Sequence, residues 1–175
     1  MIIKSYEIFV LSFDDFSNVN IDLITSSINN TYYLRMFLVY SFGDVRRDNI
    51  LNSIEKIDDF FQDGISFDFV DISIDNNANL VYLSESWYDY KDKPTTDEIE
   101  KLLEDANFIE LCKMGFLDYA VMTRDNFIHL LLTWNKILDQ LPSFALLYQD
   151  DKDWYNIVPF DSKEAMDQFI VDHVK

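Results

Sequence analysis

The apolar residues of this 175-residue chain change their spacing along the sequence, and this change limits the possible folds more than any other feature. In some segments apolar residues alternate with a period of two, as in strands, and in others they recur every three or four positions, as in helices. Two pairs of strand-like segments flank short polar stretches, which predicts two β-hairpins. We therefore expect an α+β fold, with a mostly antiparallel mixed sheet packed by several helices.

The expected strands are rich in β-branched and aromatic residues. They cover 6–13, 31–42, 66–74, 79–84, 116–122, 144–148 and 154–158, with hairpin turns at 75–78 and 149–153. For 6–13 a helix is the alternative, because both strand phases there are apolar. The alternation slips between Phe69 and Val70, where we expect a β-bulge.

Helices are expected where the apolar spacing is helical and a capping residue precedes it. They cover 20–29, 46–62, 95–111, a segment that begins after Thr123 and ends at Pro142, and a C-terminal segment after Ser162. The apolar stripe after Thr123 comprises Phe127, Leu130, Leu131, Trp134 and Leu138. That of the C-terminal segment comprises Met166, Phe169, Ile170 and Val174.

The length and composition favour one domain that covers residues 1–175. Hydrophobic residues make up 49% of the chain and aromatic residues 16%, enough for one sizeable core but not for two independent ones. With only three glycines and three prolines, the chain lacks the composition of a disordered linker, so nearly all of it should be ordered.

The distribution of apolar residues and the single cysteine indicate a cytoplasmic protein. No stretch reaches about 18 uncharged apolar residues, and the N-terminal residues do not resemble a signal peptide. Cys112 has no second cysteine with which to form an internal disulfide, so we expect a buried structural thiol in a reducing compartment.

The chain is strongly acidic, with 32 acidic and 14 basic residues and a formal net charge of -18. This charge disfavours direct binding to nucleic acid or to an anionic membrane and favours a basic partner. Residues 44–110 contain 18 acidic and six basic residues, which places -12 of the charge in the middle of the chain.

Residues 57–90 contain no lysine or arginine, and we predict a binding face there. Its aromatic residues belong to a class that often anchors interfaces, although a packed core would also explain them. The candidate binding residues are Asp58, Asp59, Asp63, Asp68, Asp71, Asp75, Glu85, Trp87, Tyr88, Asp89 and Tyr90. Selection for solubility alone is the competing explanation of the acidic residues.

No motif in the sequence indicates catalysis or a cofactor. The only histidines are His129, expected on a solvated helix face, and His173, expected in a last helical turn where the helix dipole favours a cation. Glycine-rich phosphate loops are absent, and the Cys and His content is too low for a typical zinc site. Asp75, Asn77 and Asn79 match the start of an EF-hand loop, but Leu80 and Ser86 replace its glycine and its terminal glutamate.

The C-terminal half resembles bacterial immunity proteins of contact-dependent growth inhibition and related polymorphic toxin systems. The similar residues are Met122-Thr123-Arg124-Asp125-Asn126-Phe127, Trp134, Tyr148-Gln149-Asp150-Asp151, Trp154 and Pro159-Phe160. The resemblance implies a cytoplasmic protein that binds one cognate toxin domain and blocks its activity, but it transfers no toxin-contacting residue. The charge fits this function, because nuclease toxins that bind phosphates are commonly basic.

Three other functions remain open. An acidic nucleic-acid mimic would inhibit several DNA-binding enzymes, whereas a general protein-interaction module would have no antagonistic role. The third is an enzyme whose carboxylates come from distant parts of the chain.

Overall fold

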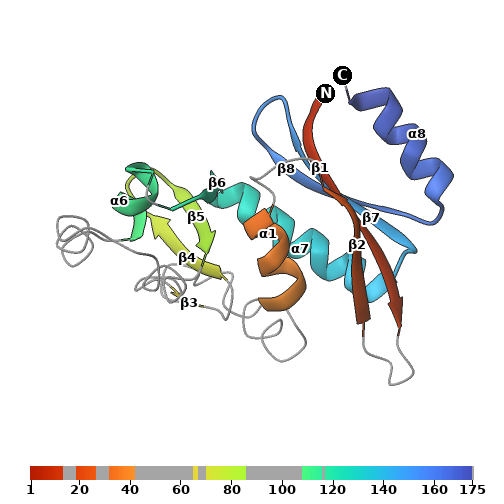
Figure 1. The fold of residues 1–175 in the computed structure, drawn as a ribbon, viewed down its shortest axis with the longest axis horizontal. Helices are drawn as coiled ribbons and strands as arrows, with labels where there is room; N and C mark the ends of the chain where they lie inside the picture. The colour runs from red at the N-terminus through yellow and green to blue at the C-terminus, as the bar shows by residue number, and fades with distance from the viewer. Residues whose placement is uncertain are drawn as a thin grey trace. The chain divides into compact units, whose positions relative to one another are not determined.

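The structure is a computed structural model that describes residues 1–13, 19–26, 32–41, 65–66, 70–85, 108–115 and 117–174 (Figure 1). Its contacts divide the chain into two compact units. Unit 1 comprises Met1–Tyr32 and Asp125–Lys175, and unit 2 comprises Tyr33–Arg124. Each unit contains one antiparallel sheet and helices, which confirms the α+β class. That the whole chain is one domain stays a prediction.

The sheet of unit 1 has four strands in the order β2-β1-β7-β8, and all neighbouring strands are antiparallel. The strands are β1 (Ile3–Phe13), β2 (Val19–Ser26), β7 (Phe144–Asp150) and β8 (Tyr155–Phe160). The β7–β8 pair is the predicted second hairpin. The N-terminal and C-terminal parts of the chain therefore build one sheet, in which β1 and β7 are the central pair.

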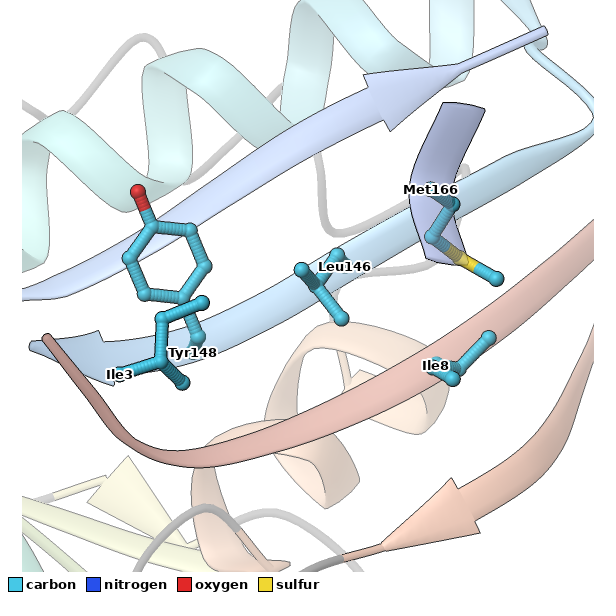
Figure 2. Packing of buried hydrophobic residues seen from close by; sticks show 5 residues of the cluster. All are labelled: Ile3, Ile8, Leu146, Tyr148 and Met166. Atoms are coloured by element: carbon cyan, nitrogen blue, oxygen red, sulfur yellow. The ribbon is translucent and has the colours of Figure 1, made fainter. Parts of the chain in front are cut away.

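Helix α8 (Lys163–His173) covers one face of this sheet. Met166 is fully buried against Ile8 and Leu146, while Ile3 and Tyr148 extend the same cluster along the sheet (Figure 2). The Ser162 hydroxyl caps the helix by accepting a hydrogen bond from the Ala165 N–H at 3.2 Å. The predicted terminal helix is confirmed, and its apolar stripe closes one side of the core.

Helix α7 (Arg124–Gln140) contributes a second set of buried residues in unit 1. Trp134 is fully buried, and its ring lies 5.8 Å from that of Phe9, which points away from the α8 side because strand residues alternate. The predicted stripe of α7 is confirmed except at Leu138, which is half-buried, whereas Ile137 is buried instead. The sheet is thus a layer between α7 and α8.

The free edge of β8 is closed by the side chain of Asn126. Its amide nitrogen donates to the Tyr155 carbonyl at 2.7 Å, and its amide oxygen accepts from the Tyr155 N–H at 2.8 Å. Asn126 thus bonds Tyr155 as a neighbouring strand would. In an edge strand, alternate residues direct their backbone N–H and C=O groups away from the sheet. Pro159 lies four residues after Tyr155 and faces the same way, so the N–H that proline lacks is not needed for pairing with β7.

Unit 2 contains a second four-stranded sheet, in the order β3-β4-β5-β6. The strands are β3 (Ile65–Ser66), β4 (Val70–Asp75), β5 (Leu80–Glu85) and β6 (Tyr119–Thr123). One face carries fully buried residues such as Ile72 and Leu83. On the other face, Tyr82 packs with Leu111 and Cys112 of helix α6 (Phe108–Lys113).

Three predictions about the local structure are wrong. Residues 20–29 were expected to be helical, but 19–26 form β2 beside β1. Residues 31–42 were expected to be a strand, but they contain helix α1 (Tyr32–Met36) and the π-helical turn η2 (Phe37–Ser41). The segment 66–74 is not one strand, because β3 folds back antiparallel onto β4.

Other predictions are confirmed or fall outside the described residues. Strand β6 and the β4–β5 hairpin lie where they were expected. The expected helix 46–62, most of the helix 95–111 and Phe69 of the expected bulge lie outside the described residues. In the part of the chain that the structure describes, no helix is long and apolar enough to cross a membrane.

Candidate functional site

Asp75 is the predicted binding residue whose contacts are best defined. It ends β4, and its carboxylate oxygen Oδ1 accepts hydrogen bonds of 3.1 Å from the backbone N–H groups of Asn77 and Ala78. The second oxygen, Oδ2, lies 2.9 Å from Nζ of Lys113. Asp75 therefore closes the hairpin turn and ties it to α6.

Lys113 connects this carboxylate with the aromatic residues of the sheet. Its ammonium lies 5.8 Å from the centre of the Tyr82 ring, which in turn lies 5.6 Å from the ring of Tyr119. The hydrogen bond to Asp75 raises the pKa of Lys113, and burial raises the pKa of Tyr82. At neutral pH this group of side chains holds a paired carboxylate and ammonium beside the neutral phenol of Tyr82.

The ion pair predicts an acid-sensitive contact. The hydrogen bond from Lys113 is the largest of the causes that lower the pKa of Asp75 below its usual value of about 3.9. The pair therefore stabilises the fold above about pH 4 and loses this contribution as the pH falls through the lowered pKa. In Lys113→Gln, we expect the Asp75 carboxyl to titrate at higher pH, as followed by carbon NMR.

A matched control for this titration is Lys163→Gln, which removes a lysine from another ion pair, that with Asp167. It should leave the Asp75 titration unchanged. An unchanged midpoint in Lys113→Gln would show that the ion pair does not set this pKa.

Asp71 lies on the same face of β4 as Asp75, four residues earlier, and is only 7% exposed. Its register partners are Ser66 in β3 and Ser84 in β5. Ser84 is also buried, and its hydroxyl donates to the Asp118 carbonyl at 2.6 Å. The structure therefore places Asp71 inside the fold rather than on an exposed face.

The remaining candidate residues are only partly covered by the structure. Glu85 ends β5, opposite Val70 in the register. The others, Asp58, Asp59, Asp63, Asp68, Trp87, Tyr88, Asp89 and Tyr90, lie outside the described residues. Among the predicted residues that the structure describes, Asp71 and Asp75 lie on the same face of β4.

The EF-hand-like start at Asp75 has a different role in the structure. Both carboxylate oxygens of Asp75 bind protein donors, and Asn79 has a left-handed backbone with φ 56°. The Asn79 carbonyl accepts from the Arg124 N–H at 3.1 Å. Across the described ranges, no three His, Cys, Asp or Glu side chains come together as a candidate metal site.

The two histidines occupy the positions expected for them. His129 is exposed on α7, and its ring lies 6.1 Å from that of Trp154. His173 lies in the last turn of α8, and its ring lies 4.3 Å from that of Phe169. Its Nδ1 lies 2.7 Å from the Phe169 carbonyl, which only accepts, so Nδ1 carries the proton.

Two buried groups that could act as nucleophiles are held in their protonated forms. Burial raises the pKa of the Cys112 thiol to about 12, and burial together with Asp153 raises that of Tyr155 to about 12. At neutral pH neither group supplies a thiolate or a phenolate. Cys112 therefore has the buried structural role expected from the sequence.

The acidic turn between β7 and β8 has a structural role that sequence reasoning missed. Asp150 Oδ1 accepts from the Lys152 and Trp154 N–H groups, at 2.9 and 3.0 Å. Asp151 Oδ1 accepts from the Ile2 N–H at 3.2 Å, which lowers the pKa of Asp151. These acids order their own turn and hold the start of β1.

The same turn carries an ion pair to the start of β1, in which Lys4 Nζ lies 2.7 Å from Asp153 Oδ1. Ile3, between Ile2 and Lys4, also pairs in parallel with Val174 beyond α8. The local signal for the turn was the run of aspartates, but nothing in the sequence linked it to the N-terminal strand.

No protein-family model, no curated protein and no solved structure matches this chain.

Proposed function

We propose that this chain is a bacterial immunity protein that binds and neutralises a cognate toxin domain, a basic nuclease, in the cytoplasm. The observation that carries the proposal is the net charge of -18 on a chain whose sequence pI is about 4.2. Such a charge attracts a basic protein over long distances and speeds its association. The resemblance of the C-terminal half to immunity proteins supports the same function.

The contacts in the structure refine which acids are available for this partner. Asp71 is buried, and Asp75, Asp151 and Asp153 bind donors of the chain itself. The proposed face within 57–90 therefore depends on the other predicted residues there, from Asp58 to Tyr90. Acids that already serve the fold are poor choices for mutations intended to test binding, because their loss also disturbs local structure.

The test is a pull-down of the tagged chain from its native host, followed by mass spectrometry and a salt titration of any complex. We expect one basic toxin domain, whose association slows as salt screens the long-range attraction. Charge reversal of Asp58, Asp59, Asp63 and Asp89 together should weaken this complex. Recovery of an acidic protein, or a salt-independent association rate, would contradict the proposal.

The same charge also supports a second function, that of a nucleic-acid mimic. Aspartate outnumbers glutamate 24 to eight, and short carboxylates are suited to imitating fixed phosphate positions. A mimic should displace DNA from several unrelated DNA-binding enzymes, whereas an immunity protein should inhibit one toxin. A panel of restriction enzymes and repressors assayed with and without the chain separates the two functions.

A further inference from the structure

We propose that two copies of this chain pair through β6, edge to edge, so that their unit 2 sheets join into one antiparallel sheet. A second copy is a partner in addition to the toxin, so this dimer does not depend on the proposed function. Three features of β6 favour the pairing: the direction of its backbone groups, the lack of protection along its edge, and the opposite charges at its two ends.

Strand β6 is the last strand of the unit 2 sheet, and its alternate residues direct their backbone groups away from β5. The Arg124 N–H donates to the Asn79 carbonyl at 3.1 Å, which makes these two residues a hydrogen-bonded pair. Along the register, Met122 therefore also bonds β5, whereas Tyr119 and Val121 face outward. Both outward residues are half-buried, and in the part of the chain that the structure describes no group bonds their outward N–H and C=O groups.

The edge of β6 lacks the protection that other strands of this chain have. Proteins commonly block a free edge with proline, with lysine, with a bulge or by keeping the strand short. Strand β3, at the opposite edge of the same sheet, has two residues, and β8 in unit 1 carries Pro159 and is closed by Asn126. Strand β6 has five residues in unbroken register with β5 and contains no proline or lysine. An edge of this kind is suited to pairing with another strand.

The charges at the ends of β6 favour a second copy as the strand that pairs with it. In a two-fold symmetric pair centred on Val121, each Val121 lies opposite its symmetry mate, and Tyr119 lies opposite Thr123. The same register places Asp118 directly opposite Arg124 of the second copy, since both lie three positions from Val121 on opposite sides. The symmetry repeats this pair of opposite charges, and the strand between them is uncharged. Cross-strand pairs of opposite charge stabilise a sheet.

The residues around β6 are fixed before the second copy arrives. Asp118 is exposed, and its carbonyl accepts from the Ser84 hydroxyl at 2.6 Å, which holds the backbone next to Tyr119 in place. The side chains of Tyr119 and Val121 pack against the cluster around Tyr82 but stay half-buried. Pairing covers these side chains further, so the dimer gains buried apolar surface in addition to backbone hydrogen bonds.

The experiment is sedimentation equilibrium of the full chain over a range of concentrations, in salt that screens the repulsion between two copies of charge -18. We expect a monomer–dimer equilibrium. Asp118→Lys and Arg124→Glu should each weaken the dimer by about tenfold, since two attractive pairs become repulsive. An equimolar mixture of these two variants should associate about as tightly as the unmodified chain, because opposite charges then meet at both ends of the strand.

Val121→Pro tests the backbone pairing. The N–H that it removes faces outward, so the sheet keeps its own hydrogen bonds, but the central pair of the dimer loses both of its bonds. We expect a loss of at least about tenfold, against less than about threefold for Val121→Thr, which keeps the N–H and nearly the same shape. Circular dichroism checks the fold, and if Val121→Pro unfolds the chain, the mixture of charge variants decides. A chain that stays monomeric, or a mixture that fails to recover association, would overturn the proposed dimer.

Discussion

Replacement of Asn126 with alanine should lower the free energy of unfolding by about 3 kcal/mol, since it leaves two buried backbone groups without partners. Asn126 is 1% exposed, and its amide supplies both hydrogen bonds to the backbone of Tyr155, which is also 1% exposed. Among the described residues no other side chain bonds these two groups, so without Asn126 water would have to enter the core or the edge of β8 would have to move. Urea unfolding followed by circular dichroism measures the loss.

The matched control is Asn156→Ala, which removes the same amide one residue further along β8. Asn156 is half-buried and makes a weaker contact, 3.3 Å from its amide nitrogen to the Trp154 carbonyl. Its loss should cost less than about 1 kcal/mol. Equal losses in the two variants would show that Asn126 does not close the strand edge.

Truncation of Trp134 to alanine should cost about 4 kcal/mol, because it removes the largest fully buried side chain of the described residues and leaves a cavity beside Phe9. The two rings lie 5.8 Å apart and tilted by 55°, so their favourable contact is lost as well. Chemical unfolding of the purified variant measures this change. A variant too unstable to purify can be replaced by Trp134→Phe, which should show a smaller loss.

Trp154→Ala is the corresponding control, because it removes the same side chain from a half-buried position in the same unit. Its ring contacts the exposed His129, so little core volume is lost. We expect a cost of about 1 kcal/mol, in line with partial burial. A loss as large as that of Trp134→Ala would mean that the two rings contribute equally to the core.

The sequence predicted best those elements in which local preference and burial agree. In α7 and α8, helical spacing coincides with capping residues, and in the two hairpins apolar strand-forming segments flank turn-forming Asp and Asn. Each of these signals can be read within about 20 residues.

The wrong predictions arose where one pattern fits two structures. The run from Tyr32 to Ser41 is apolar on both strand phases, but its buried residues Tyr33, Leu34, Phe37 and Leu38 have helical spacing. In β2, Val19, Ile21 and Leu23 alternate with polar Asn20 and Asp22, a strand pattern that the helix prediction overlooked. Short apolar segments remain ambiguous until their packing partners are known.

Long-range contacts explain what could not be predicted about the candidate site. Asp71 and Asp75 lie in a segment without lysine or arginine, yet Asp75 meets Lys113 from a distant helix and Asp71 is buried in the sheet. Sequence identifies the charge of such residues but not the partners that neutralise or cover them. The roles of Asp151 and Asp153 at the start of β1 escaped prediction for the same reason.

The pairing of β1 with β7 also sets the order in which the chain can fold during its synthesis. Ile3 pairs with Asp150, so β1 emerges from the ribosome long before its central partner, while all of 33–124 is translated between them. Unit 2 is continuous in sequence and can fold first, whereas β1 must wait with one edge unpaired. Slow translation of the C-terminal third would lengthen this interval, and with it the risk of aggregation.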